Sequence, residues 1–253
     1  MNLIFKIIII VIFSTIVNAR NKGETEISTE NGIEVFQNEK YYLLKKNVII
    51  KSDNFSLNAD NVKINFNKDM YDIVEIDAKG EVMFDSITFN SKGSGERLNL
   101  KVKLEEIKIY GIDSILSTDD VEMFSDGYIK VNNLNGKFSI KGQNSKLINE
   151  GIYIEGETID GIFSNINNGK EINSLNISDN SISYVRNQDS EMFAKKINFN
   201  NNTSIIELID DVTIIRDGEK ITGDYGTLDT KNNSYKIKSN NKSKVKAIIK
   251  NNE

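Results

Sequence analysis

Apolar and polar residues alternate along nearly the whole chain after residue 30. Representative runs are Val62-x-Ile64-x-Phe66, Leu98-x-Leu100-x-Val102 and Ile197-x-Phe199. Because successive side chains of a strand point to opposite faces, this spacing predicts strands with one apolar and one solvated face. Asn, Asp, Gly and Lys clusters interrupt the runs at intervals of about 8–12 residues, which is typical of turns. The chain is therefore predicted to be all-β, with roughly fifteen to twenty short antiparallel strands. The polar stretch 165–174 is predicted to be a long loop.

One pattern occurs twice at a fixed offset of 164 residues, without a gap. The paired positions are Val48 and Val212, Ile50 and Ile214, Leu57 and Ile221, Ala59 and Gly223, Asp60 and Asp224, and Ile64 and Leu228. Repeated strand units indicate a stack in which each unit buries its apolar face only against its neighbours. The small residue is predicted to lie where the backbone bends or approaches another strand closely. The acid after it is predicted to accept hydrogen bonds from turn amides.

The N-terminus has the pattern of a signal peptide. Lys6 precedes an apolar run from Ile7 to Val17, and Val17-Asn18-Ala19 supplies a cleavage site. The run is shorter than the roughly 20 residues that a membrane-spanning helix needs. We therefore expect a signal peptide at residues 1–19, cleaved near Ala19, one domain at residues 20–253, and export from the cytoplasm. An uncleaved membrane anchor is the alternative.

Composition excludes several kinds of chemistry. The chain has no Cys, His, Pro or Trp, so it has no thiol nucleophile, disulfide, Cys/His metal cage or serine–histidine triad. Its net charge of −5 argues against nucleic acid as a partner. Most of the 37 acidic residues are expected to be solvated surface. No catalytic residue, metal site or cofactor is predicted, and the protein is not expected to be an enzyme.

The two copies of the pattern resemble a known family. The segments "NVIIKSDNFSLNADNVKINF" and "DVTIIRDGEKITGDYGTLDTKNNSYKI" are similar to the OstA-like repeat of LptA-type periplasmic lipopolysaccharide-transport proteins, over residues 40–85 and 175–250. Residues 90–165 match only as further alternating strands. The resemblance implies a V-shaped, semi-open β-jelly roll whose apolar interior holds the acyl chains of lipopolysaccharide. It also implies a location in the periplasm and two partners of the same fold, an inner-membrane-anchored OstA-like protein and the periplasmic part of an outer-membrane β-barrel translocon.

Alternation assigns the residues of each predicted surface. The predicted lipid-binding groove consists of Val48, Ile50, Leu57, Val62, Ile64, Phe66, Val212, Ile214, Ile221 and Leu228. A closed core that no ligand enters is the alternative for each of them. The first and last strands, near residues 32–48 and 233–249, are predicted to pair with partner proteins and to allow head-to-tail homo-oligomers. The predicted partner edge consists of Tyr235, Ile237, Val245, Ala247 and Ile249.

The end of the chain is rich in lysine. Residues 231–250 contain seven Lys and no acid, which fits either contact with lipid phosphates or an acidic partner, or a solvated edge strand. Three other functions remain open. The chain could be an inner-membrane-anchored, LptC-like member of the same pathway, a secreted β-solenoid structural or adhesin protein, or, least favoured, a carbohydrate-active solenoid enzyme.

Overall fold

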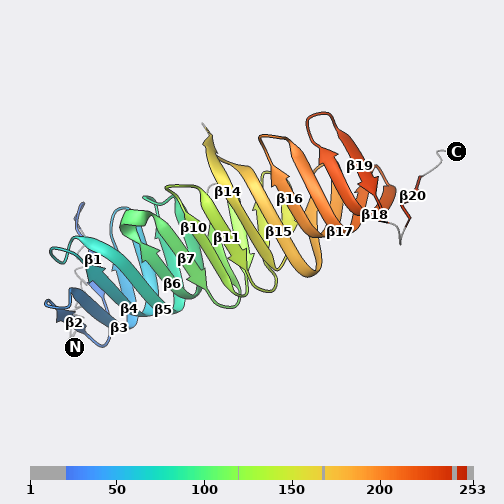
Figure 1. Cartoon of the computed structure of the whole chain (residues 1–253). Helices are drawn as coiled ribbons and strands as arrows, with labels where there is room; N and C mark the ends of the chain where they lie inside the picture. Colours follow the sequence, from blue (N-terminus) through green and yellow to red (C-terminus); the bar gives the residue numbers. More distant parts are fainter. Residues whose placement is uncertain (1–20, 119, 167–168, 241–243, 250–253) are drawn as a thin grey trace, which may run out of the picture.

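The computed structural model describes residues 21–118, 120–166, 169–240 and 244–249, and the predicted signal peptide lies outside them. The described residues form one continuous sheet of twenty antiparallel strands with one short 3-10 helix, which confirms the predicted fold class (Figure 1). The described part of the chain contains no helix that is long and apolar enough to cross a membrane. The strands are β1 (Glu26–Ser28), β2 (Ile33–Phe36), β3 (Tyr41–Lys51), β4 (Phe55–Phe66), β5 (Ile73–Ser86), β6 (Ser91–Lys101), β7 (Glu106–Tyr110), β8 (Ser114–Ser117), β9 (Val121–Ser125), β10 (Tyr128–Asn132), β11 (Lys137–Lys141), β12 (Lys146–Asn149), β13 (Ile152–Glu155), β14 (Thr158–Ile166), β15 (Gly169–Arg186), β16 (Ser190–Asn200), β17 (Ile205–Arg216), β18 (Glu219–Asp229), β19 (Ser234–Lys238) and β20 (Lys246–Ile248), with helix η1 (Val102–Leu104) after β6.

The sheet is folded lengthwise into two layers. The first layer runs β2-β3-β4-β5-β6-β7-β10-β11-β14-β15-β16-β17-β18-β19. The second runs β1-β3-β4-β5-β6-β8-β9-β12-β13-β15-β16-β17-β18-β20. The long strands belong to both layers, and their pairing shifts register where they cross from one to the other, as between Lys45 and Val48. We call this fold line the corner, and the opposite side, where hairpin turns join the strands, the mouth.

The 164-residue repeat corresponds to equivalent strands. Its first copy forms β3 and β4, and its second forms β17 and β18. Both copies turn the corner through two consecutive residues with positive φ, Lys46-Asn47 in one and Asp210-Asp211 in the other. These pairs are also 164 residues apart, so the repeat encodes the bend itself as well as the strands beside it.

Small residues lie on the inner side of the corner, as predicted. Ala59 and Ala194 are buried there, and a Cβ atom on Gly95 would lie 2.5 Å from Ile109 Cγ2 and 2.9 Å from Ser114 Oγ. The acids beside them have two roles. Asp224 accepts a hydrogen bond from the backbone N–H of Asn240 (2.8 Å), as predicted, whereas the Asp60 side chain covers Gly80.

Gly95→Ala is expected to destabilise the protein by about 1–3 kcal/mol, because its methyl group would overlap Ile109 and the Tyr110 carbonyl. Gly226→Ala is the matched control, since its Cβ would meet no atom closer than 3.3 Å. Urea unfolding of both variants gives the comparison. If Gly95→Ala loses no more stability than Gly226→Ala, the corner tolerates a side chain at position 95.

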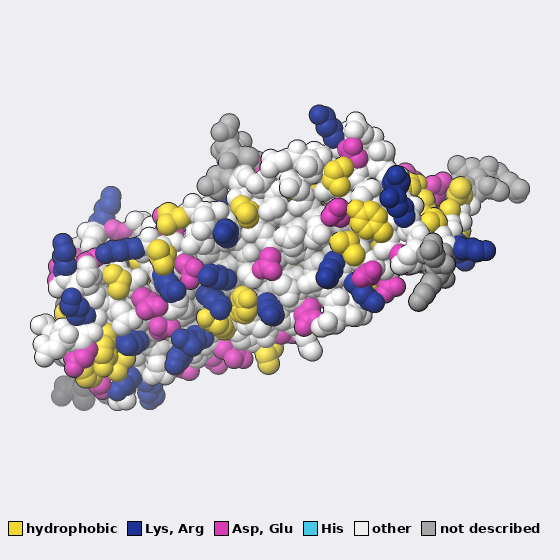
Figure 2. All heavy atoms as spheres, in the orientation of Figure 1, with side chains coloured by type: hydrophobic (Ala, Val, Ile, Leu, Met, Phe, Trp, Pro, Cys, Tyr) yellow, Lys and Arg dark blue, Asp and Glu magenta, His cyan; other side chains and the backbone are white. Residues whose placement is uncertain are grey.

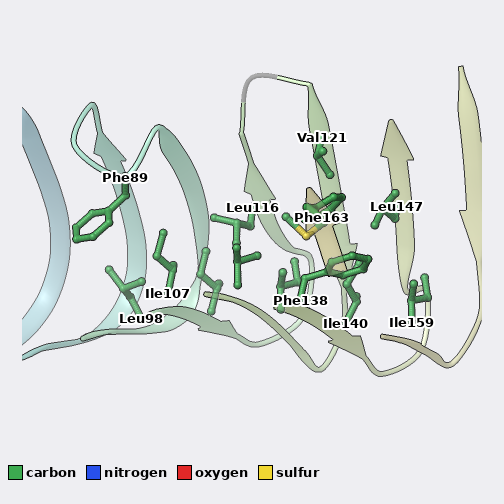
Figure 3. Close-up of a cluster of buried hydrophobic side chains, with 14 of the residues drawn as sticks. Phe89, Leu98, Ile107, Leu116, Val121, Phe138, Ile140, Leu147, Ile159 and Phe163 are labelled. Carbon is green, nitrogen blue, oxygen red and sulfur yellow. The ribbon is translucent and has the colours of Figure 1, made fainter. Parts of the chain in front are cut away.

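The core lies between the layers and extends along the length of the fold. Its central part packs Leu98, Ile107, Ile140 and the Phe138–Phe163 pair, whose ring centroids are 4.2 Å apart (Figure 3). Burial also raises the pKa of Tyr42 to about 12, so this inward-facing phenol stays neutral.

The long loop predicted at residues 165–174 is wrong. Strand β14 continues to Ile166, and β15 begins at Gly169 and pairs with it, for example through Ser164 and Glu171. Backbone pairing sustains these strands although Asn is the commonest residue of the segment. Among residues 169–174, whose burial the structure describes, only Ile172 is buried, so the alternation is too weak to recognise.

Candidate functional site

The predicted groove residues lie in the interior between the two layers. Nine of the ten are buried and belong to the continuous apolar core, namely Val48, Ile50, Leu57, Val62, Ile64, Phe66, Val212, Ile214 and Leu228. Ile221 is half-buried, near the C-terminal end of the fold. The nine are packed against other side chains, so the structure brings them together as core, and their contact with lipid stays a prediction.

An open space lies elsewhere in the same interior. A cavity of about 320 Å³ lies between the layers in the C-terminal half. Its apolar lining comes from both layers and consists of Ile152, Ile154, Ile172, Leu175, Val185, Met192, Ile197, Phe199 and Ile206. Asn149, Glu150, Glu171, Asn187 and Thr230 complete the lining with polar groups. This is an apolar pocket with a polar margin, the arrangement that suits the acyl chain of an amphipathic lipid.

None of the ten predicted groove residues lines this cavity. The lining strands do show alternation in the sequence, as in Ile152-x-Ile154 and Ile197-x-Phe199. That signal identifies inward-facing residues, but it does not show where their side chains fail to fill the interior.

Hydrogen bonds between the layers close the middle of the mouth. Asn133 Nδ2, on the first layer, donates to the carbonyl of Phe89 on the second (3.1 Å). The backbone N–H of Lys170, on the first layer, donates to Asp120 Oδ2 on the second (3.2 Å). Asn149 Nδ2, on the second layer, also donates to the carbonyl of Lys170 on the first (3.5 Å). The semi-open roll that the sequence predicts is therefore bridged at its centre, and the cavity lies on the C-terminal side of the bridge.

The apolar interior continues to the last described strands at both ends. At the N-terminal end, Ile33 and Val35 of β2 pair with the buried residues Leu44 and Tyr42, and both are exposed. The predicted edge at residues 32–48 thus includes the true edge strand β2, whereas β1, the edge of the second layer, was not predicted.

The C-terminal end is built in the same way. Tyr235 and Ile237 of β19 pair with Leu228 and Gly226, and Ala247 of β20 pairs with Ile221. These three predicted edge residues therefore continue the interior face. Val245 and Ile249 directly precede and follow β20, and both are exposed. Their binding to a partner stays a prediction.

The lysines near the C-terminus are exposed where the structure describes them, and their contact with lipid phosphates or an acidic partner stays a prediction. Lys231, Lys236, Lys238, Lys244 and Lys246 are exposed, and Lys242 and Lys250 lie outside the described residues. No group of three or more acidic side chains among the described residues is arranged to hold a metal ion.

A comparison of the sequence with protein families identifies its relatives. Residues 26–133, from β1 to the end of β10, match the family described as LptA/(LptD N-terminal domain) LPS transport protein. Over these residues the chain is similar to the OstA-like lipopolysaccharide-transport family. The match includes β3–β5, the first segment on which the sequence resemblance rests, and extends into residues 90–133. Strands β11–β20 lie beyond the match and continue the same two layers.

Two further comparisons add little. No curated protein matches the sequence. Among solved structures, the chain is similar to LptH from Pseudomonas aeruginosa, described as the LptA-homologous periplasmic component of the conserved lipopolysaccharide transport device. The identity is 8%, over 90% of this chain and 96% of that one, with a TM-score of 0.23. A TM-score this low carries no weight for fold or function.

Proposed function

We propose that the protein is a non-enzymatic carrier that moves lipopolysaccharide across the periplasm. The observation that carries the proposal is the apolar interior, which continues through the whole stack of strands and contains a cavity of about 320 Å³. Among the described residues, nothing covers this interior at either end of the stack. The match of residues 26–133 to a family described as LPS transport protein supports lipopolysaccharide as the cargo.

The chemistry of such a carrier is burial alone. Each CH₂ group that leaves water gains about 0.8 kcal/mol, so an acyl chain of about 12–14 carbons gains on the order of 10 kcal/mol when it is fully enclosed. A carrier without an energy source must enclose the lipid only partly, so that the lipid can leave. A cavity that contacts water along a polar margin meets this requirement better than a sealed core.

The two ends of the fold connect the carrier to neighbouring proteins. The exposed β1–β2 and β19–β20 edges join the interior to that of the next protein, which is an inner-membrane-anchored OstA-like protein at one end and an outer-membrane β-barrel translocon at the other. Head-to-tail copies of this chain use the same edges. An LptC-like anchored role is the alternative, and N-terminal sequencing of the exported protein separates the two, because a chain beginning near Arg20 has no anchor.

Photo-crosslinking tests the cargo and its path. A photo-reactive residue at Ile197, which lines the cavity, is expected to trap lipopolysaccharide, and one at Asn198 is not, because strand neighbours point to opposite faces. Val62 and Lys63 form a second matched pair in the packed N-terminal half, where a crosslink at Val62 requires the core to open. Equal crosslinking at Ile197 and Asn198 would contradict an interior path. A folded protein without any crosslinked lipid would favour a structural or adhesin role.

A further inference from the structure

Three neighbouring hairpin tips at the mouth edge of the first layer carry exposed, large apolar side chains. Tyr71 is 93% exposed and, with Met70, forms the tip between β4 and β5. Leu104 is 51% exposed at the tip between β6 and β7, and Leu134 is 61% exposed at the tip between β10 and β11. Since neighbouring strands lie about 4.8 Å apart, successive tips are about 10 Å apart. They form a single row over the N-terminal half, which we call the tip row.

The tip row is held in place by contacts between its members. Lys103 Nζ lies 3.7 Å from Asp72 Oδ1 and joins the first tip to the second. Asn132 Nδ2 donates to the carbonyl of Leu104 (3.1 Å), and the backbone N–H of Asn133 donates to the carbonyl of Glu105 (3.0 Å). The second and third tips are therefore also joined. The apolar side chains project from a connected platform rather than from independent loops.

Exposed apolar tips are not a general consequence of this fold. The equivalent hairpins further along the first layer, at residues 201–204 and 230–233, contain only Asn, Thr, Ser and Lys. The tips change character from apolar to polar between the N-terminal and C-terminal halves. The apolar side chains thus mark one stretch of the mouth edge.

Lysines accompany the apolar tips. Lys68, Lys101, Lys103 and Lys137 lie on the three tips or on the strand ends beside them. Two of these lysines have acidic partners, because Lys103 pairs with Asp72 (3.7 Å) and Lys101 pairs with Glu106 (3.3 Å). Lys68 and Lys137 are exposed, and Asp69 Oδ1 accepts the backbone N–H groups of Tyr71 and Asp72. Figure 2 shows separate hydrophobic side chains along the upper edge of the N-terminal half, among Lys and Arg side chains.

We propose that the tip row inserts into the interfacial region of a phospholipid bilayer that carries anionic headgroups. Tyr, Leu and Met are the side chains that enter this region, and the exposed Lys68 and Lys137 beside them meet lipid phosphates. Separate convex side chains on three tips fit a fluid surface better than a shaped protein pocket, which needs one contiguous patch. The inference does not depend on the cargo in the interior, because the tip row lies outside it.

A tryptophan reporter tests insertion directly, because the chain contains no Trp. The protein is produced by export, so that its N-terminus is processed as in the cell. Leu104→Trp is expected to shift its fluorescence to shorter wavelength with vesicles of phosphatidylcholine and phosphatidylglycerol. Ile112→Trp is the matched control, because Ile112 is 66% exposed but lies at the corner, away from the mouth. It is expected to show no shift, and an equal shift in both variants would overturn the proposal.

Vesicle co-sedimentation tests whether the row provides the binding. The triple variant Tyr71→Ser, Leu104→Ser and Leu134→Ser is expected to bind the same vesicles at least about tenfold more weakly, and Ile112→Ser is expected to bind like the unaltered protein. All three sites are exposed, so circular dichroism should show folded variants. Weaker binding to vesicles of phosphatidylcholine alone would identify the lysine contribution. Undiminished binding of the triple variant, or no binding by the unaltered protein, would refute the proposal, as would tip-dependent self-association without vesicle binding.

Discussion

Deletion of residues 234–253 is expected to abolish end-to-end association while leaving a folded protein. The deletion removes β19 and β20, which are largely exposed and, among the described strands, pair only with β18. The remaining layers keep every other strand pairing, so β-sheet content should persist. The loss should be complete, because the two strands supply both the free backbone groups of this edge and the apolar side chains that continue the interior.

The measurements are pull-down of an OstA-like partner, analytical ultracentrifugation at high protein concentration, and circular dichroism. Two point variants test whether association depends on the interior-facing side chains of β19 or only on the presence of the strand. Tyr235→Asp places a charge on the interior face and should weaken association strongly, whereas Lys236→Asp places it on the outer face of the same strand. Normal association of the truncated protein would exclude this edge as the joint. Global unfolding would show instead that β19 and β20 are required for the core.

Much of the fold was accessible from local sequence pattern. Alternation identified strands and the side of each strand that faces the interior, which is why nine of the ten predicted groove residues are buried together. The 164-residue repeat also identified equivalent strands, since both copies bend at paired positions with positive φ. These properties depend on residues that are close in sequence, and a single chain displays them directly.

The cavity and the bridged mouth depend on residues that are far apart in sequence. Asp120 and Lys170 meet across the mouth although 50 residues separate them. The cavity exists because side chains from β12–β13 and β15–β17 leave a space between the layers. Alternation specifies which side chains face inward, but the free volume depends on how the two layers pack together. The loop prediction for residues 165–174 failed for a related reason, because the segment forms strands through pairing between β14 and β15 and not through its own composition.

Filling the cavity is expected to remove lipid binding without loss of stability. Val185 lies in the second layer and lines the cavity, so Val185→Leu, Val185→Phe and Val185→Trp should occupy progressively more of its volume. Larger side chains placed in a real void have room and need not strain the core. Bound glycolipid should fall along the series, by at least about tenfold at Trp, while the thermal midpoint is kept or rises.

Native mass spectrometry of the exported protein measures the bound lipid, and thermal unfolding measures stability. Arg186→Trp is the matched control, because Arg186 is the exposed neighbour of Val185 on the same strand and points to the outer face. It introduces the same side chain outside the cavity and should leave lipid binding unchanged. If the Val185→Trp protein is folded and still carries its full complement of glycolipid, the lipid does not occupy this cavity. The packed N-terminal interior around Val62 would then be the remaining interior path, and the Val62–Lys63 crosslinking pair would decide it.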